Sequence, residues 1–151
     1  MTQIQLEQTA LTPPVIQVLL QLSQKWADEN SCHGYVCNTP ADLEGRTVFL
    51  ARHDQRVVGY LFGVFEKTAR DSSIIAKNSS VFEIEELFVL PDFRGQGIGG
   101  ALFERCEQTV RAQAQYITLS TATKNWKGIL HFYLDELDMT FWSARLFKKL
   151  S

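Results

Sequence analysis

Long apolar runs, an even set of cysteines and an excess of positive charge are all missing from this sequence of 151 residues. No stretch approaches the roughly 18 apolar residues of a membrane helix, so we expect no membrane segment. Fifteen Lys and Arg against seventeen Asp and Glu give a formal net charge of -2, which creates no overall field for nucleic acid or anionic membranes. Three widely spaced cysteines argue against a disulfide framework.

The first ten residues, MTQIQLEQTA, lack the basic start and apolar run of a secretory signal, so we expect a cytoplasmic protein. Cys32, His33 and Cys37 have the side-chain types of zinc ligands but no fourth partner at a zinc spacing, and we expect no metal. Hydrophobic residues make up 45% of the chain and charged residues 21%, as in globular proteins. We therefore expect a single domain over residues 1–151.

The pattern of apolar residues predicts the order of helices and strands. Alternating or β-branched runs indicate strands, and apolar residues at three- and four-residue steps indicate helices. The expected elements are a strand at 3–7, a helix at 15–26 ending near 30, a surface segment at 31–45 with a short helix at 40–43, strands at 47–51 and 57–65, a polar connector at 67–80, a strand at 81–90, a helix at 98–114, a strand at 115–120, a helix at 126–137 and a strand at 141–150. This order predicts a mixed α/β sheet covered by helices.

The strongest functional signal is PDFRGQGIGG at 91–100, directly after an expected strand. A strand, a glycine turn and a helix in succession place free backbone N–H groups and the positive end of a helix dipole at one point. Glycines at 95, 97 and 99 permit positive φ and close approach of a ligand, and Arg94 can add a charge-assisted hydrogen bond. The segment predicts a pyrophosphate site.

Two familiar phosphate loops fit poorly. A P-loop ends in Gly-Lys-Ser or Gly-Lys-Thr, whereas this loop ends in Gly99-Gly100-Ala101. A dinucleotide fingerprint is matched by the glycines at 95, 97 and 100, but the acidic residue expected about 20 positions later is absent from QYITLSTATKN. A nicotinamide-dependent redox protein is therefore disfavoured.

The segment Arg94-Gly95-Gln96-Gly97-Ile98-Gly99 resembles the R/Q-x-x-G-x-G/A signature of the Gcn5-related N-acetyltransferases (GNAT). EELFVLP at 85–91 is similar to the fourth strand of that family, and the element order resembles the family fold throughout. The resemblance implies acetyl-CoA as co-substrate, with its pyrophosphate on the amides of Gly95, Gln96, Gly97, Ile98, Gly99 and Gly100. It further implies that the fourth and fifth strands splay apart, that pantetheine pairs along Leu87, Phe88 and Val89, and that a backbone N–H around Phe88 polarises the thioester carbonyl.

NWKGILHFY at 125–133 resembles the family's N-x-x-A-x-x-F-Y segment, with Gly128 in place of the usual Ala and one additional residue. The match implies that Tyr133 protonates the coenzyme A thiolate and that Asn125 binds pantetheine. A purely structural reading is a half-buried core tyrosine and a helix cap, and both readings stay open.

Acetyl transfer to an amine needs a base, because amines are mostly protonated at neutral pH. Strand alternation places Glu85 on a mixed row with Glu83 and Leu87, and Glu86 within an apolar row. IEELFV also resembles the LEDFFV-type strand of polyamine acetyltransferases, which implies Glu85 as the base acting through water. Glu86 is the alternative, because burial among apolar residues would raise its pKa.

We therefore predict an N-acetyltransferase that moves acetyl by direct attack to a primary amine. The carboxylates of Glu66, Glu83, Glu85 and Glu86 favour a small cationic molecule. A non-catalytic sensor that binds coenzyme A, or a protein N-acetyltransferase, is the alternative. The resemblance also implies a homodimer formed through the final strand.

Overall fold

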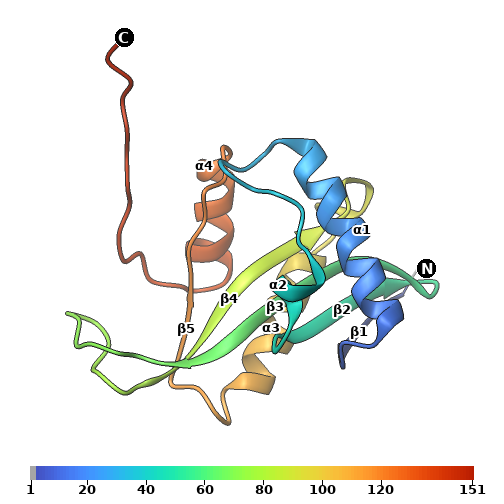
Figure 1. The fold of residues 1–151 in the computed structure, drawn as a ribbon, viewed down its shortest axis with the longest axis horizontal. Coiled ribbons are helices and arrows are strands. Elements are labelled where there is room, and N and C mark those ends of the chain that lie inside the picture. The colour runs from blue at the N-terminus through green and yellow to red at the C-terminus, as the bar shows by residue number, and fades with distance from the viewer. Residues whose placement is uncertain (1–2) are drawn as a thin grey trace.

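The computed structural model describes residues 3–151, which form one five-stranded mixed sheet (Figure 1). Strands β1 (Ile4–Thr9), β2 (Thr47–His53), β3 (Arg56–Lys67) and β4 (Ser80–Val89) are antiparallel neighbours in chain order. Strand β5 (Tyr116–Leu119) lies parallel to β4 at the edge. The predicted mixed α/β fold is confirmed.

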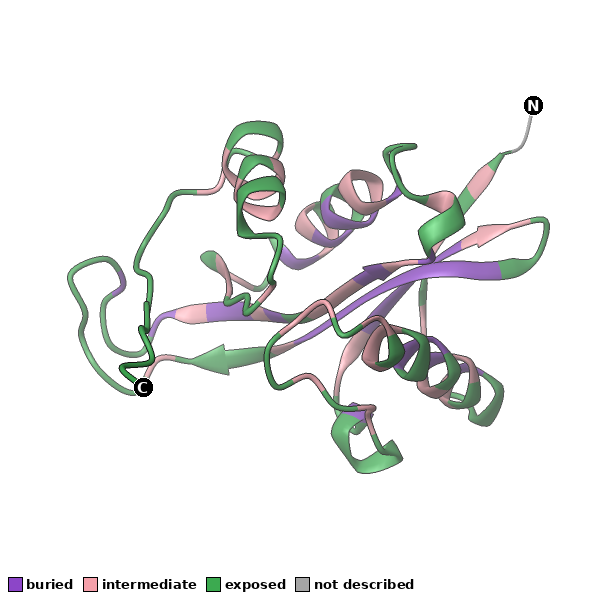
Figure 2. Ribbon diagram, turned by 90° about the horizontal axis from the view of Figure 1, so that it is seen from above, coloured by how far each residue is buried: buried purple, intermediate pink, exposed green. Residues whose placement is uncertain are grey.

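Helices cover both faces of this sheet (Figure 2). On one face lie α1 (Pro13–Glu29) and α2 (Pro40–Leu43), and on the other lie α3 (Ile98–Val110) and α4 (Trp126–Leu130) with the π-helical turn η2 (His131–Glu136). A short 3₁₀ turn, η1 (Pro91–Phe93), joins β4 to the glycine loop. Burial on both faces makes the central strands nearly continuous apolar runs. Those runs include Val48–Ala51 and Val57–Phe62.

Local sequence explains where the helices begin and end. The Thr12 hydroxyl accepts a hydrogen bond from the Val15 amide at 3.4 Å, and two prolines fill the first turn of α1. Asn30 ends that helix in the left-handed conformation, with φ 54°. None of the helices among residues 3–151 is long and apolar enough to cross a membrane.

The β4 and β5 strands splay apart, as predicted. Only Val81–Ile84 pair with Tyr116–Leu119, and β5 supplies no partner to the rest of β4. The β3–β4 register also slips, because Phe62 pairs with Glu86 and Gly63 with Ile84, so Glu85 is an extra residue. A side chain at position 63 would lie 2.3 Å from the Glu83 carbonyl, so glycine is required at this bulge.

The predicted final strand at 141–150 is wrong. Residues after Met139 have no regular secondary structure and form the red C-terminal segment of Figure 1. Side chains of this segment touch the body of the protein: Trp142 borders a hollow beside β5, and the Phe147 ring lies 6.1 Å from the His33 ring. Within residues 3–151 this segment forms no backbone hydrogen bond beyond the Met139 amide, which donates to the Tyr133 carbonyl. Its residues have β-strand propensity, but a strand also requires a neighbouring edge, and the chain brings none alongside.

Candidate active site

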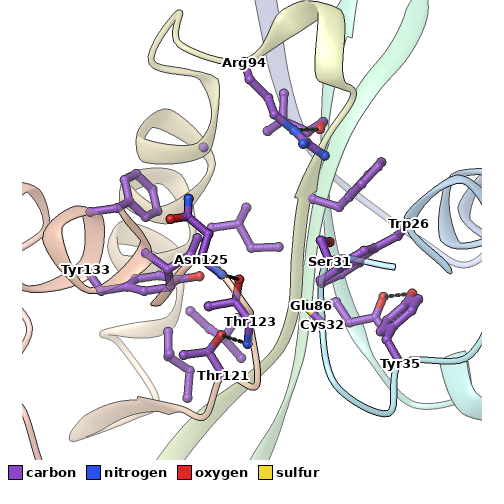
Figure 3. A pocket seen from close by; sticks show the side chains of 18 of the residues that line it. Trp26, Ser31, Cys32, Tyr35, Glu86, Arg94, Thr121, Thr123, Asn125 and Tyr133 are labelled. Atoms are coloured by element: carbon purple, nitrogen blue, oxygen red, sulfur yellow. Dashed lines mark hydrogen bonds between the residues drawn. The ribbon is translucent and has the colours of Figure 1, made fainter. Parts of the chain in front are cut away.

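The splay between β4 and β5 opens into a cleft of about 750 Å³ (Figure 3). Its walls come from α1, the segment after α1, β4, the glycine loop, the β5–α4 connection and the π-helical turn. Most of the predicted site residues line it: Glu85, Leu87, Phe88, Val89, Arg94, Gly95, Gly97, Ile98, Gly99, Gly100, Asn125 and Tyr133. Gln96 does not, and Glu86 does.

The glycine loop presents its backbone openly to the cleft. Gly95 and Gly97 have φ of 76° and 83°, and Gly97 is the residue from which α3 begins. A side chain built at either position would meet nothing within 4 Å, so the space beside these amides is free. Gly99 has a different role, because a Cβ there would lie 3.3 Å from the Phe132 ring of the π-helical turn. The loop therefore combines a helix N-terminus whose open amides suit an anion with close helix packing.

Arg94 lies on the α1 side of this loop rather than over its amides. Its Nε donates to the Val89 carbonyl at 2.8 Å and its Nη2 donates to Glu29 at 2.5 Å. The guanidinium carbon also lies 5.3 Å from the centre of the Phe88 ring. Arg94 thus closes the upper end of the cleft in Figure 3.

The free edge of β4 offers peptide groups to the cleft. The Leu90 amide donates to the Val58 carbonyl of β3 at 2.8 Å. Because peptide groups alternate in direction along a strand, those of Leu87 and Val89 face away from β3. The bond from Arg94 to the Val89 carbonyl agrees with this direction. The resemblance to the family implies that a backbone N–H around Phe88 faces the thioester. The Phe88 amide itself faces β3, and the nearest amides that face the cleft are those of Leu87 and Val89.

Glu86 is held by three donors at the base of the cleft. The hydroxyls of Tyr60 and Tyr35 donate to Oε1 at 2.7 and 2.9 Å, and Asn38 Nδ2 donates to Oε2 at 2.9 Å. Burial raises the pKa of Glu86 above its ordinary value, while these hydrogen bonds oppose that shift. A carboxylate poised in this way has the character of a general base.

Glu85 is instead paired with Arg46. Two guanidinium nitrogens donate to its two oxygens at 2.6 and 2.8 Å, from the connection between α2 and β2. Strand alternation separates Glu85 from Glu86, but the bulge brings both toward partners on the α1 side of the sheet. Glu83 accepts a hydrogen bond from Thr118 of β5. Glu83 and Glu66, which the sequence pattern predicts beside the substrate, instead line a separate hollow of about 260 Å³.

Tyr133 reaches the cleft from the opposite wall (Figure 3). Burial raises its pKa to about 12, and the nearby Cys32 thiol acts in the same direction, so its hydroxyl keeps its proton at neutral pH. Tyr133 lies in the π-helical turn, a form that accommodates an additional residue in a helix. The segment 125–133 is one residue longer than the family pattern, and the π-helical turn can accommodate this additional residue.

Asn125 precedes α4, and its side chain folds over Gly128. A Cβ at position 128 would lie 2.7 Å from Asn125 Nδ2, so an alanine here would require the Asn125 side chain to move. The Asn125 side chain forms no capping hydrogen bond to the helix, and its backbone carbonyl accepts from the Ile129 amide at 3.1 Å. The amide side chain is thus available to a ligand in the cleft.

Two loops meet across the cleft and enclose it. The His33 amide donates to the Ala122 carbonyl at 2.9 Å, and the Lys124 amide donates to the Ser31 carbonyl at 2.8 Å. Together with the β4–β5 pairing and α1, this bridge completes a ring around the site. Among the described residues, no group of three or more His, Cys, Asp or Glu side chains could hold a metal ion.

Sequence reasoning missed the partners of Glu86. Tyr60 lies in a strand where every neighbour is apolar, and Tyr35 and Asn38 lie in a segment without regular periodicity. Trp26 stacks on Tyr35 and Phe88, with ring centres 4.3 and 5.4 Å apart. In the sequence it is only one residue of the apolar stripe of α1. A polar tip on a buried aromatic residue is the sole signal that could have indicated Tyr60.

Comparisons with known proteins agree with this geometry. An uncharacterized N-acetyltransferase of Archaeoglobus fulgidus is 39% identical over 64 residues, which cover 38% of this chain and 36% of the relative, so the match spans only about a third of that protein. An aminoglycoside acetyltransferase from an uncultured soil metagenomic sample has the same fold, with a TM-score of 0.71, 18% identity and 99% of both chains covered.

A predicted acetyltransferase of Clostridium acetobutylicum, solved with acetyl-CoA, superposes with a TM-score of 0.68 at 14% identity over 99% of this chain and 96% of that one. The family described as "Acetyltransferase (GNAT) family" matches residues 16–137, which span the six site-forming segments from within α1 to the π-helical turn. The chain therefore belongs to the GNAT family of acetyltransferase enzymes.

Proposed function

We propose that this protein transfers the acetyl group of acetyl-CoA to the primary amine of a small cationic molecule, by direct attack while both substrates are bound. The observation that carries this proposal is the convergence of four features in one cleft. These are the open glycine loop, the unpaired edge of β4, the half-buried carboxylate of Glu86 and the protonated Tyr133.

The residues present suit the co-substrate. Backbone amides at 95–100, beside the N-terminus of α3, would bind the pyrophosphate, because they offer unpaired donors and a favourable dipole. The outward peptide groups of Leu87 and Val89 would pair with the pantetheine as an added strand would, and Asn125 would bind it from the other wall. Either outward amide would also stabilise negative charge on the thioester oxygen, which replaces the role first expected near Phe88.

For the base we propose Glu86 rather than Glu85. Glu86 is half-buried in the cleft and burial raises its pKa, so its ionised form is a stronger base than an ordinary glutamate. Glu85 already forms two charged hydrogen bonds with Arg46, which would have to break before it could act. Tyr133 would return a proton to the leaving thiolate from the opposite wall.

The acceptor side of the cleft supports a cationic substrate. Glu86 lines it together with the aromatic faces of Trp26 and Tyr35, and Glu85 borders the cleft as the partner of Arg46. Carboxylates and aromatic rings both attract ammonium groups. The structural neighbours named aminoglycoside acetyltransferases are compatible with such an acceptor, since aminoglycosides carry several amines.

Thiol release with a panel of amines tests the proposal. Purified protein and acetyl-CoA should release coenzyme A with at least one small polycationic amine, and more slowly with neutral amines of similar size. A protein that binds acetyl-CoA but releases no thiol above background with any small amine or peptide would be the non-catalytic sensor. Faster release with peptides than with small amines would instead identify a protein N-acetyltransferase.

We further propose that two copies associate through the C-terminal segment 141–150. Leu146, Phe147 and Leu150 are 94%, 84% and 87% exposed, and β5 ends the sheet with a free edge. Each copy carries both the unpaired segment and the free edge of β5. In a two-fold dimer, the segment of each copy would therefore pair with the β5 edge of the other copy, an exchange of segments.

Light scattering after size exclusion should therefore find a dimer of the full chain. Changing Leu146 and Phe147 together to Asp should give a monomer, because charged side chains would be buried in the exchange. The change Lys148→Gln, on the same segment, serves as the control and should keep the dimer. A full chain that remains monomeric at every concentration would contradict the exchange.

A further inference from the structure

The carboxylate of Glu86 is surrounded by a set of polar side chains that come from α1, the segment after α1 and β3. Besides Tyr60, Tyr35 and Asn38, the set includes Ser23, a fully buried residue of α1. Ser23 Oγ lies 2.7 Å from the Tyr35 hydroxyl and accepts from the Asn38 backbone amide at 2.9 Å. These four side chains and Glu86 lie within the α1 half of the molecule, away from the wall that carries Tyr133.

The hydrogen bonds to Glu86 leave one acceptor position of its carboxylate free. An ionised carboxylate has about four acceptor positions, two on each oxygen. The two tyrosine hydroxyls occupy those of Oε1, and Asn38 Nδ2 occupies one of Oε2. One acceptor position therefore remains, on Oε2. Because Glu86 also lines the cleft, this position is open to a group bound there.

The direction of each hydrogen bond in the chain behind Glu86 is also determined. The Tyr35 hydroxyl donates its single proton to Glu86, so the Ser23 hydroxyl must be the donor in the hydrogen bond between Ser23 and Tyr35. The Asn38 amide in turn donates to Ser23. Every donor points toward Glu86, and the chain ends at the Asn38 backbone amide behind Ser23; neither group is a base. A proton taken up by Glu86 thus has no path into the protein.

We propose that Tyr60 and Tyr35 are positioning residues that hold Glu86 with only Oε2 free, so that this atom takes the substrate's proton and returns it through the cleft. The inference rests on the proposed function, because it assigns Glu86 as the base. The two hydroxyls act on the ionised form of Glu86 and do not touch the reacting atoms.

The charged and titratable groups that face Glu86 are few. Tyr35 and Tyr60 are its direct partners, and burial raises the pKa of both, so they remain neutral donors throughout the working pH range. Glu85 is its neighbour on β4, and Arg46 pairs with that carboxylate. Removing a tyrosine hydroxyl therefore changes one stabilising contact of the ionised carboxylate and no charge.

The variants Tyr60→Phe and Tyr35→Phe test the inference, with Tyr116→Phe, a partly exposed tyrosine of β5, as the control. Carbon-13 NMR of the Glu86 carboxyl should show its pKa rising by about one unit in each test variant and not in the control. The acid limb of the pH profile of kcat should shift by the same amount, which lowers kcat about tenfold on that limb. The KM for acetyl-CoA should not change.

An unmoved carboxyl pKa in both test variants would overturn the inference, as would a loss of kcat that is equal at every pH. Tyr35→Phe changes a residue at the cleft surface and keeps the test open if the buried Tyr60→Phe variant does not fold. The NMR titration needs no turnover. A protein that acetylated no amine would refute the proposed function while the titration still decided whether the tyrosines control Glu86.

Discussion

Replacing Glu86 with glutamine is expected to lower kcat by about 10²–10⁴-fold, the usual contribution of a general base. Glutamine keeps the size of the side chain and can still accept hydrogen bonds from Tyr60 and Tyr35. It cannot take a proton, so the amine would attack only in the small fraction that is already neutral. Steady-state kinetics with the amine found in the panel would measure the loss.

Glu85→Gln is the matched control, because it changes the adjacent carboxylate in the same way. Glu85 lies in a partly exposed ion pair with Arg46, and loss of such a pair costs only about 1 kcal/mol or less. We expect a change in kcat of less than about tenfold. If the larger loss followed Glu85→Gln, the base would be the carboxylate that strand alternation predicts.

The pH dependence follows from the same residue. Glu86 must be ionised to act, and burial raises its pKa, so kcat should rise with pH through a value above the ordinary glutamate pKa. The rise should disappear in Glu86→Gln. A rise that persisted unchanged in this variant would assign the titration to another group.

Replacing Gly97 with valine should weaken binding of acetyl-CoA by about 100-fold or more, equivalent to roughly 2.7 kcal/mol. A β-branched side chain at φ 83° is strained and would project beside the amides from which α3 begins. Because nothing lies within 4 Å of the new Cβ, the loss would come from blocked approach and a distorted loop, not from a clash within the fold. Isothermal titration calorimetry would measure the affinity.

Gly45→Val provides the control for backbone strain. Gly45 has a similar φ of 77°, also has nothing within 4 Å of a built Cβ, and does not line the cleft. Both variants should lose similar stability in thermal unfolding, of order 1–3 kcal/mol, but only Gly97→Val should lose acetyl-CoA. Equal affinity in both variants would show that the glycine loop does not bind the pyrophosphate.

Position 85 shows where sequence patterns fail in this protein. Alternation along a strand is a local rule, and it places Glu83 on the same row as Glu85, whereas Glu83 lies in a separate hollow and not in the cleft. The one-residue bulge opposite Gly63 shifts the register between these two carboxylates, and no property of IEELFV by itself reveals that bulge. The final segment fails for a related reason, because strand propensity at 141–150 predicts extended backbone but not the edge with which it pairs.

The sequence alone determined the elements whose signals are local: the capped α1, the glycine turn that begins α3 at residue 97, and the strand that precedes this turn. Those signals depend on backbone conformation and apolar spacing over a few residues. Tertiary structure decided which carboxylate lies half-buried in the cleft and which polar groups hold it. Tyr35, Asn38 and Tyr60 reach Glu86 across separations of 26 to 51 residues, Ser23 supports Tyr35 and Asn38 from behind, and only the packing of α1 on the sheet brings them together.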